Sequence, residues 1–251
     1  MGTPSIASKI EDFARNIYIK DMTGENFIEN IIHATNLESI LSRMVPAAPG
    51  DPILEMGFGE GTITEPLLKA GYRVDIVEGS SELCKDASAR FPTEQLRVNC
   101  AFFEQFTPAK PYMNILSLHV LEHVDDLSPV ISNMLRWLAP EGRVIAAVPN
   151  AQSLHRQLAV SMGLQEQNNS LSPRDIKVGH QRVLTLDELE DEFNQAGFEV
   201  IERFGYFLKI VPNSMMVDWS PDLIRALTTI SDQLPPHLMA NIGVVARRRY
   251  Q

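Results

Sequence analysis

The chain has 251 residues, of which 44% are hydrophobic and 22% charged, and its formal net charge is -10 at pH 7. These proportions suit a globular protein large enough for one α/β core with additional segments. The negative charge argues against extended nucleic-acid binding, which requires Lys and Arg to neutralise phosphates. No apolar run approaches the roughly 18–20 residues of a membrane span. Residues 1–20 lack the apolar block of a signal peptide, so we expect a cytoplasmic protein that does not enter membranes.

Two amphipathic helices, 6–18 and 26–43, are predicted to form an N-terminal helical cap over residues 1–48. From residue 49 onward, short apolar strands alternate with helices, which is typical of βαβ units. The expected strands are 52–56, 72–77, 96–100, 112–118, 143–148, 198–206 and 241–248. The expected helices between them are 62–70, 81–90, 127–138 and one that begins at the capping box of Thr185 and Glu188.

Two stretches interrupt this alternation. Residues 150–183 are polar and irregular, and residues 207–236 resemble an inserted helical segment. Long connections of this kind are commonly lids or binding loops. We therefore predict one α/β domain over 49–251, with a Rossmann-like, seven-stranded, mostly parallel sheet, helices on both of its faces, and lids near 150–183 and 207–236. The apolar Met215, Met216 and Trp219 suit either a lid or the surface of a homodimer.

A glycine-rich turn follows the first expected strand, which ends near Glu55. Glycine permits a sharp turn and the close approach of a ligand, and ligands of parallel sheets bind at the carboxyl ends of the strands. The glycines stand at 57, 59 and 61, a G-x-G-x-G spacing that differs from the G-x-G-x-x-G of nucleotide-phosphate sites. Glu55 can meet a cationic amino group. Glu78 ends the next strand, where a carboxylate can bind ribose hydroxyls.

These residues resemble the class I S-adenosylmethionine-dependent methyltransferases, whose first strand carries E/D-x-G-x-G-x-G. The resemblance covers roughly residues 52–248. It implies that Glu55 and Gly57 hold the methionine end of the cofactor and that Glu78 binds its ribose. Segment 98–104 resembles the adenine-contacting stretch, although Ala101 stands where many members have aspartate. On this basis the cofactor-binding residues are Glu55, Gly57, Gly59, Gly61, Glu78, Gly79, Ala101, Phe102 and His119.

A histidine cluster, His119-Val-Leu-Glu122-His123, directly follows the fourth expected strand. It resembles a motif of the ubiquinone-biosynthesis O-methyltransferases, which in some relatives supplies divalent-metal ligands at these three spacings. His119, Glu122 and His123 then form a metal triad. In a second interpretation His119 lines the cofactor pocket and His123 is a general base. In a third, Glu122 and His123 only brace the loop.

Two further segments are predicted to face the mouth of the active site. His155 and Arg156 follow the fifth strand, and His180 and Arg182 precede the capped helix. Both segments resemble those of methyltransferases that act on sugars, quinone precursors and other small metabolites. His155 and His180 can bind substrate hydroxyls or a metal, and His180 is an alternative base. Arg156 and Arg182 can pair with an acidic group of the substrate. The other interpretation is that these residues brace the loop. Phe13 and Tyr18 either close over the cofactor or pack in the core, which we favour.

The combined motifs predict an S-adenosylmethionine-dependent methyltransferase with a small-molecule acceptor. The expected reaction is O-methylation of a sugar, a phenol or another metabolite hydroxyl, with or without a divalent metal. The alternatives are N-methylation of a small amine and a non-catalytic binding module with the same fold.

Overall fold

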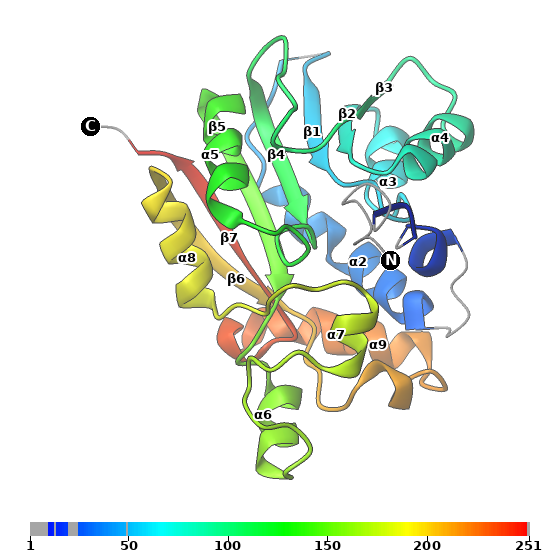
Figure 1. The fold of residues 1–251 in the computed structure, drawn as a ribbon, viewed down its shortest axis with the longest axis vertical. Helices are drawn as coiled ribbons and strands as arrows, with labels where there is room; N and C mark the ends of the chain where they lie inside the picture. Colours follow the sequence, from blue (N-terminus) through cyan, green and yellow to red (C-terminus); the bar gives the residue numbers. More distant parts are fainter. Residues whose placement is uncertain (1–9, 13, 20–24, 49, 250–251) are drawn as a thin grey trace, which may run out of the picture.

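The computed structural model describes residues 10–12, 14–19, 25–48 and 50–249; Phe13 lies outside these ranges. Its seven strands form one sheet in the order β3-β2-β1-β4-β5-β7-β6 (Figure 1). The strands are β1 (Pro52–Met56), β2 (Arg73–Glu78), β3 (Leu96–Cys100), β4 (Tyr112–Leu118), β5 (Leu138–Pro149), β6 (Phe198–Tyr206) and β7 (Asn241–Arg248). Only β7 runs antiparallel to its neighbours β5 and β6. The predicted Rossmann-like sheet is confirmed.

Helices cover both faces of this sheet (Figure 1). One face packs against α5 (Leu127–Trp137) and α8 (Leu186–Gln195). The other packs against α2 (Glu25–Ser42), α3 (Thr64–Lys69), α4 (Ser81–Arg90) and α9 (Pro221–Thr229). Successive residues of the central strands alternate between the two apolar clusters; Ile115 belongs to the first and Leu116 to the second. This two-sided burial explains the continuous apolar runs of the sequence.

The described part of the N-terminal cap packs into the same apolar cluster as the sheet. Ile28 and Ile32 of α2 share one apolar cluster with Ile53 and Val74 of the sheet. Ahead of α2, residues 10–12 are helical and the π-helix η1 spans Ala14–Ile19, so the described part differs from the regular helix predicted over 6–18. None of the described helices combines the length and apolarity that crossing a bilayer requires.

Strand β5 begins five residues earlier than the sequence predicts, at Leu138, whose backbone pairs with Tyr112. The extension includes Pro140 and Gly142, which look like helix-terminating residues in the sequence. A Cβ at Gly142 would lie 2.9 Å from the carbonyl oxygen of Tyr112. Glycine is thus needed where the two backbones approach closely beside a register shift.

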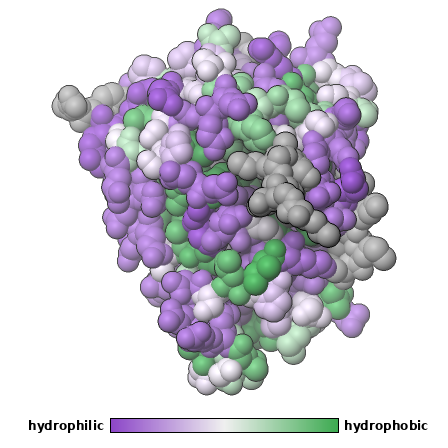
Figure 2. All heavy atoms as spheres, viewed as in Figure 1, coloured by the Kyte–Doolittle hydropathy of each residue, from purple (hydrophilic) through white to green (hydrophobic). Residues whose placement is uncertain are grey.

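Residues 150–183 are more regular than predicted, since they contain α6 (Leu154–Ser161) and α7 (Pro173–Lys177). The second insertion contains η2 (Asn213–Met215), α9 and η3 (Ile230–Gln233), and η4 (Pro236–Leu238) follows it. Its first residues border the main cavity, whereas α9 packs against α2. Figure 2 shows a mostly hydrophilic face with apolar residues interspersed, more of them in the lower half, where α6 projects in Figure 1.

Candidate active site

The glycine turn follows β1 and adopts a backbone that side chains would obstruct. Gly57, Gly59 and Gly61 have φ values of +74°, +55° and +72°, in the left-handed region that favours glycine. A Cβ on Gly57 would lie 3.2 Å from Val120, and one on Gly61 would lie 2.9 Å from the Phe58 ring. The amide of Gly57 donates to the carbonyl oxygen of Val77 at 2.9 Å, which joins the turn to β2.

Two buried carboxyl groups flank this turn. Glu55 accepts a hydrogen bond from Thr64 Oγ1 at 2.7 Å, and burial raises its pKa to about 8. Glu78 accepts from the amides of Phe58 at 2.9 Å and Ser80 at 2.7 Å. Burial raises the pKa of Glu78 although these amides oppose the shift. Glu78 therefore ties the end of β2 to the turn as well as facing the cavity.

A cavity of about 1340 Å³ opens at the carboxyl ends of the strands. It exceeds the roughly 300–1,000 Å³ of an ordinary ligand pocket, so a second molecule has room beside a cofactor. The predicted cofactor residues that line it are Glu55, Gly57, Gly59, Glu78, Gly79, Phe102 and His119. Gly61 and Ala101 do not line it. Gly61 shapes the turn, and the Ala101 amide donates to the carbonyl oxygen of Glu78 at 3.0 Å.

The N-terminal segment borders the cofactor end of the cavity. Tyr18 lines the cavity, with its ring 3.6 Å from where a Cβ of Gly59 would lie, so it does more than pack in the core. Glu11 accepts hydrogen bonds from the amide of Ser81 and the hydroxyl of Ser80, both at 2.7 Å. A carboxylate at this place satisfies amides at the start of α4.

His119 adopts a left-handed backbone, with φ +58°, and both of its ring nitrogens are engaged inside the protein. Nδ1 lies 3.1 Å from Glu122 Oε1, and Nε2 lies 2.7 Å from the Tyr206 hydroxyl. The ring of His33 meets it edge-on at 4.8 Å. His33 lines the cavity, and burial lowers its pKa to about 4. Sequence inspection missed His33 because it lies on α2, outside any motif.

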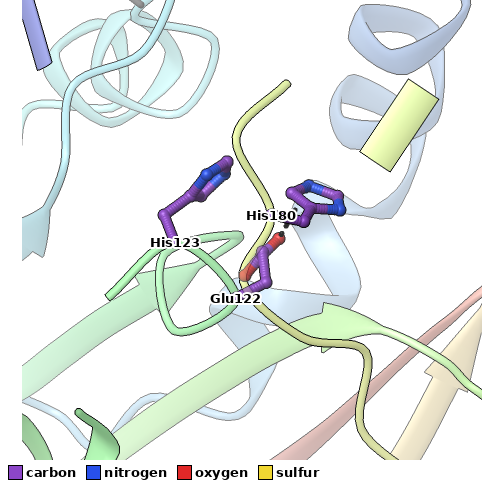
Figure 3. A group of neighbouring side chains, drawn as sticks. All are labelled: Glu122, His123 and His180. Atoms are coloured by element: carbon purple, nitrogen blue, oxygen red, sulfur yellow. Dashed lines mark ion pairs between the residues drawn. The ribbon is translucent and has the colours of Figure 1, made fainter. Parts of the chain in front are cut away.

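The structure therefore changes the predicted metal triad, because His119 has no ring nitrogen to spare. Within the described ranges, Glu122, His123 and His180 lie close enough to share an ion, with ligand atoms within 4.8 Å of one another (Figure 3). Burial acts to raise the pKa of Glu122, but the contact with His119 outweighs it and lowers the pKa to about 2. The second oxygen, Oε2, is buried and accepts no hydrogen bond from any described residue.

His180 is held by a network that the sequence did not reveal. Its Nδ1 lies 2.9 Å from Asp175 Oδ1. The other Asp175 oxygen accepts from Arg156 at 2.6 Å and from the amide and hydroxyl of Ser172 at 2.7 and 2.6 Å. Burial opposes ionisation of Asp175, yet these donors hold its pKa well below its usual range. One sequence pattern could have indicated the position of Asp175, namely the capping box of Ser172 and Asp175 that begins α7.

The predicted substrate residues separate into two groups. Arg156 is buried in its ion pair with Asp175, and Arg182 donates to the carbonyl oxygens of Leu121 and Asp125 at 3.1 and 2.7 Å. Arg156 lines the cavity with its guanidinium already paired, whereas Arg182 does not line the cavity. Both arginines brace loops in this structure. His155 does line the cavity, and its Nδ1 is buried without a partner.

Comparison with known proteins assigns the chain to a family. The family model for the methyltransferase domain matches residues 29–203, well over half of the chain, so the chain belongs to the methyltransferase-domain family. Together with the glycine turn, its acidic flanks and the seven-stranded sheet, this identifies an S-adenosylmethionine-dependent methyltransferase.

Among curated proteins the chain is similar to a ubiquinone biosynthesis O-methyltransferase of Rickettsia canadensis, 23% identical over 82% of this chain and 87% of that one. A methyltransferase in complex with the Trm112 methyltransferase activator of Haloferax volcanii has the same fold, with a TM-score of 0.64, 16% identity and coverage of 98% and 99%. The glycopeptide N-methyltransferase MtfA, solved with S-adenosylmethionine, gives a TM-score of 0.57, 15% identity and coverage of 86% and 94%.

Proposed function

We propose that this enzyme methylates a hydroxyl group of a small-molecule acceptor and that His180 removes the hydroxyl proton. The observation that carries the proposal is the contact between His180 Nδ1 and Asp175, because it directs the other nitrogen, Nε2, toward Glu122 at 4.0 Å. His180 lines the cavity that also contains the glycine turn. The similarity to an O-methyltransferase of ubiquinone biosynthesis supports oxygen as the methylated atom.

The chemistry follows from these contacts. When Nδ1–H donates to Asp175, Nε2 carries the lone pair that accepts a proton. The acceptor oxygen attacks the methyl carbon as the bond from carbon to sulfur breaks, which leaves S-adenosylhomocysteine. The hydroxyl proton moves to Nε2, and the ionised Glu122 and Asp175 stabilise the resulting imidazolium. Methyl transfer needs in-line alignment above all. His123 is the weaker candidate base, since burial lowers its pKa to about 4.

The experiment follows release of S-adenosylhomocysteine with a panel of small hydroxyl and amine acceptors and determines the product by NMR. In His180→Gln we expect turnover to fall by about 10²–10⁴-fold, with affinity for S-adenosylhomocysteine unchanged. His237→Gln, at an exposed histidine of η4, is the matched control and keeps full activity. Unchanged turnover in His180→Gln, or a product methylated on nitrogen, would overturn the proposal.

A divalent cation is the second candidate, and the buried, unpartnered Glu122 Oε2 favours it. Glu122, His123 and His180 would hold the ion, with Asp175 orienting His180 from behind as in many histidine-ligated sites. Such an ion acts as a Lewis acid that makes the acceptor hydroxyl easier to ionise. Titration calorimetry with Mg²⁺ and Zn²⁺ on chelator-treated protein tests this. Binding that disappears in Glu122→Gln supports the metal, whereas full turnover in excess chelator excludes it.

A further inference from the structure

The Lys and Arg side chains that line the cavity are grouped away from its cofactor end. At the cofactor end the side chains of Glu55, Glu60 and Glu78 line it. All the Lys and Arg residues that line it in the described part of the chain come from α6, α7 and the segment after β6; they are Arg156, Arg174, Lys177 and Lys209. The acidic end suits the cationic cofactor. Carboxylates also line this second region, among them Glu25, Glu29 and Asp175, so what matters is which of the cations lacks a partner.

Lys209 differs from the two arginines among these cations. Arg156 pairs with Asp175 and Arg174 pairs with Glu25, each at 2.6 Å. Lys209 has no ion pair or hydrogen bond with any residue of the described ranges. Burial lowers the pKa of Lys209, as expected for an amine withdrawn from water without a direct partner. A half-buried cation of this kind gains from any anion that reaches it.

The groups around Lys209 are also incompletely paired. Asn213 is 1% exposed, and its amide donates to Glu29 while its Oδ1 has no partner. The buried Nδ1 of His155 likewise has none. Burial first, and then the nearby Lys209 and Arg156, lower the pKa of His155 to about 2, so this ring is neutral. The charge of Glu29 acts to raise the pKa of Lys209, and the charge of Lys209 acts to lower the pKa of Glu29. The two side chains nevertheless form no ion pair with each other.

The backbone that presents Lys209 is fixed in an uncommon conformation. Phe207 has φ +67°, and it and His119 are the non-glycine residues with positive φ among those described. Both line this cavity. The Phe207 amide donates to Ser231 Oγ at 2.9 Å, and its carbonyl oxygen accepts from the Ala240 amide at 2.9 Å. Strained backbone held from both sides is found preferentially at ligand sites.

We propose that Lys209 anchors a carboxylate of the methyl acceptor, with His155 beside it, so that the enzyme selects acidic hydroxyl compounds. This inference rests on the proposed function, since it concerns the acceptor of that reaction. The anion would lie between the Lys209 ammonium and the His155 ring, whose Nδ1 can donate to it, while the hydroxyl extends toward His180. A charge-assisted hydrogen bond in a partly dry site discriminates strongly against a neutral isostere.

Binding is the sharpest test, because it does not require methyl transfer. The protein is loaded with S-adenosylhomocysteine and titrated by calorimetry with hydroxy acids and their primary amides, for example 3- and 4-hydroxybenzoate against 3- and 4-hydroxybenzamide, together with aliphatic hydroxy acids and their amides. We expect the best acid to bind at least about tenfold more tightly than its amide, equivalent to about 1.4 kcal/mol. Lys209→Met should abolish this preference, and Lys209→Arg should retain most of it.

Lys177→Met is the matched control, because Lys177 is an exposed lysine at the rim of the same cavity. It should keep the preference. Affinity for S-adenosylhomocysteine and the melting temperature show that each variant is folded. Equal binding of acids and amides across the set, or a preference that survives in Lys209→Met, would overturn the inference. His180→Gln distinguishes the two proposals. If it loses turnover but still prefers acids to amides, the carboxylate site of Lys209 and the role of His180 as base are independent.

Discussion

The hydroxyl of Thr64, in the first turn of α3, donates a 2.7 Å hydrogen bond to the carboxyl group of Glu55 at the end of β1. Both residues are buried, at 0% and 5% exposure. The bond crosses the glycine turn and fixes the orientation of Glu55 toward the cavity. No other described residue donates a hydrogen bond to this carboxyl group. Burial therefore outweighs the Thr64 contact and raises the pKa of Glu55 to about 8.

Cofactor affinity should therefore depend on pH. Without ligand the folded protein keeps Glu55 protonated up to about pH 8, because burial raises its pKa far above the ordinary 4.5 of a glutamate. The ammonium group of the cofactor favours the carboxylate, so binding below pH 8 releases a proton. Affinity for S-adenosylhomocysteine should rise by up to about tenfold per pH unit and level off above pH 8. Calorimetry from pH 6.5 to 8.5 measures this, and Glu55→Gln should remove the slope. A wild-type affinity independent of pH would contradict the prediction.

The same shift affects stability with a defined sign. Between pH 4.5 and about 8 the folded protein binds a proton at Glu55 that the unfolded chain has lost. This contribution is complete below pH 4.5 and disappears as pH rises through 8. Denaturant unfolding of wild type and Glu55→Gln at pH 6 and 8.5 should show a smaller decline for the variant. Equal declines would assign the pH dependence to other groups.

Gly57→Ala should separate ligand contact from backbone strain. At φ +74° a side chain is unfavourable, and the new Cβ would meet Val120 at 3.2 Å. We expect a loss of about 1 kcal/mol in unfolding free energy and at least tenfold weaker S-adenosylhomocysteine binding. Gly163→Ala is the control, since φ is +69° there with nothing within 4 Å. It should lose similar stability and no affinity. If both variants bind normally, the turn does not carry the cofactor.

Arg156→Met should destabilise the protein strongly. The Arg156 and Asp175 side chains are 6% and 8% exposed, so removal of the cation leaves a buried carboxylate without its partner. Such losses are about 3–5 kcal/mol. Arg203→Met breaks the exposed pair with Asp187, at 41% and 76% exposure, and should change stability by less than about 1 kcal/mol. Urea unfolding of the two variants compares them directly, and equal effects would refute the buried network.

Tyr206→Phe should affect His119 specifically. The change removes the hydroxyl that lies 2.7 Å from His119 Nε2 and leaves that nitrogen without its partner. We expect a loss of about 1–3 kcal/mol in unfolding free energy. Tyr72→Phe, at a side chain 38% exposed, should have almost no effect. NMR of the His119 ring would show the change in its surroundings, and an unchanged ring signal would mean that the contact is absent in solution.

Much of this molecule follows from local sequence patterns. The apolar runs, the turn glycines and the capping box of Thr185 and Glu188 predicted the strands, the cofactor turn and the start of α8. These features depend on residues close in sequence. The extension of β5 was missed because Pro140 and Gly142 are ordinary helix stops, whereas pairing with β4 on both sides of this stretch, at Leu138 and Arg143, depends on a strand distant in sequence.

The active site shows the same division. The sequence by itself determined the class of enzyme and its cofactor, because Glu55, the three glycines and Glu78 act through one strand–turn–helix unit and the strand beside it. Tertiary structure alone decided which polar residues meet around the acceptor. It turned His119 toward Tyr206, placed His180 beside Glu122, used Arg156 to hold Asp175 and left Lys209 without an ion pair among the described residues. These contacts join segments that are far apart in the chain. Their energies depend on burial and on interatomic distances, which cannot be obtained from the spacing of residues in the sequence.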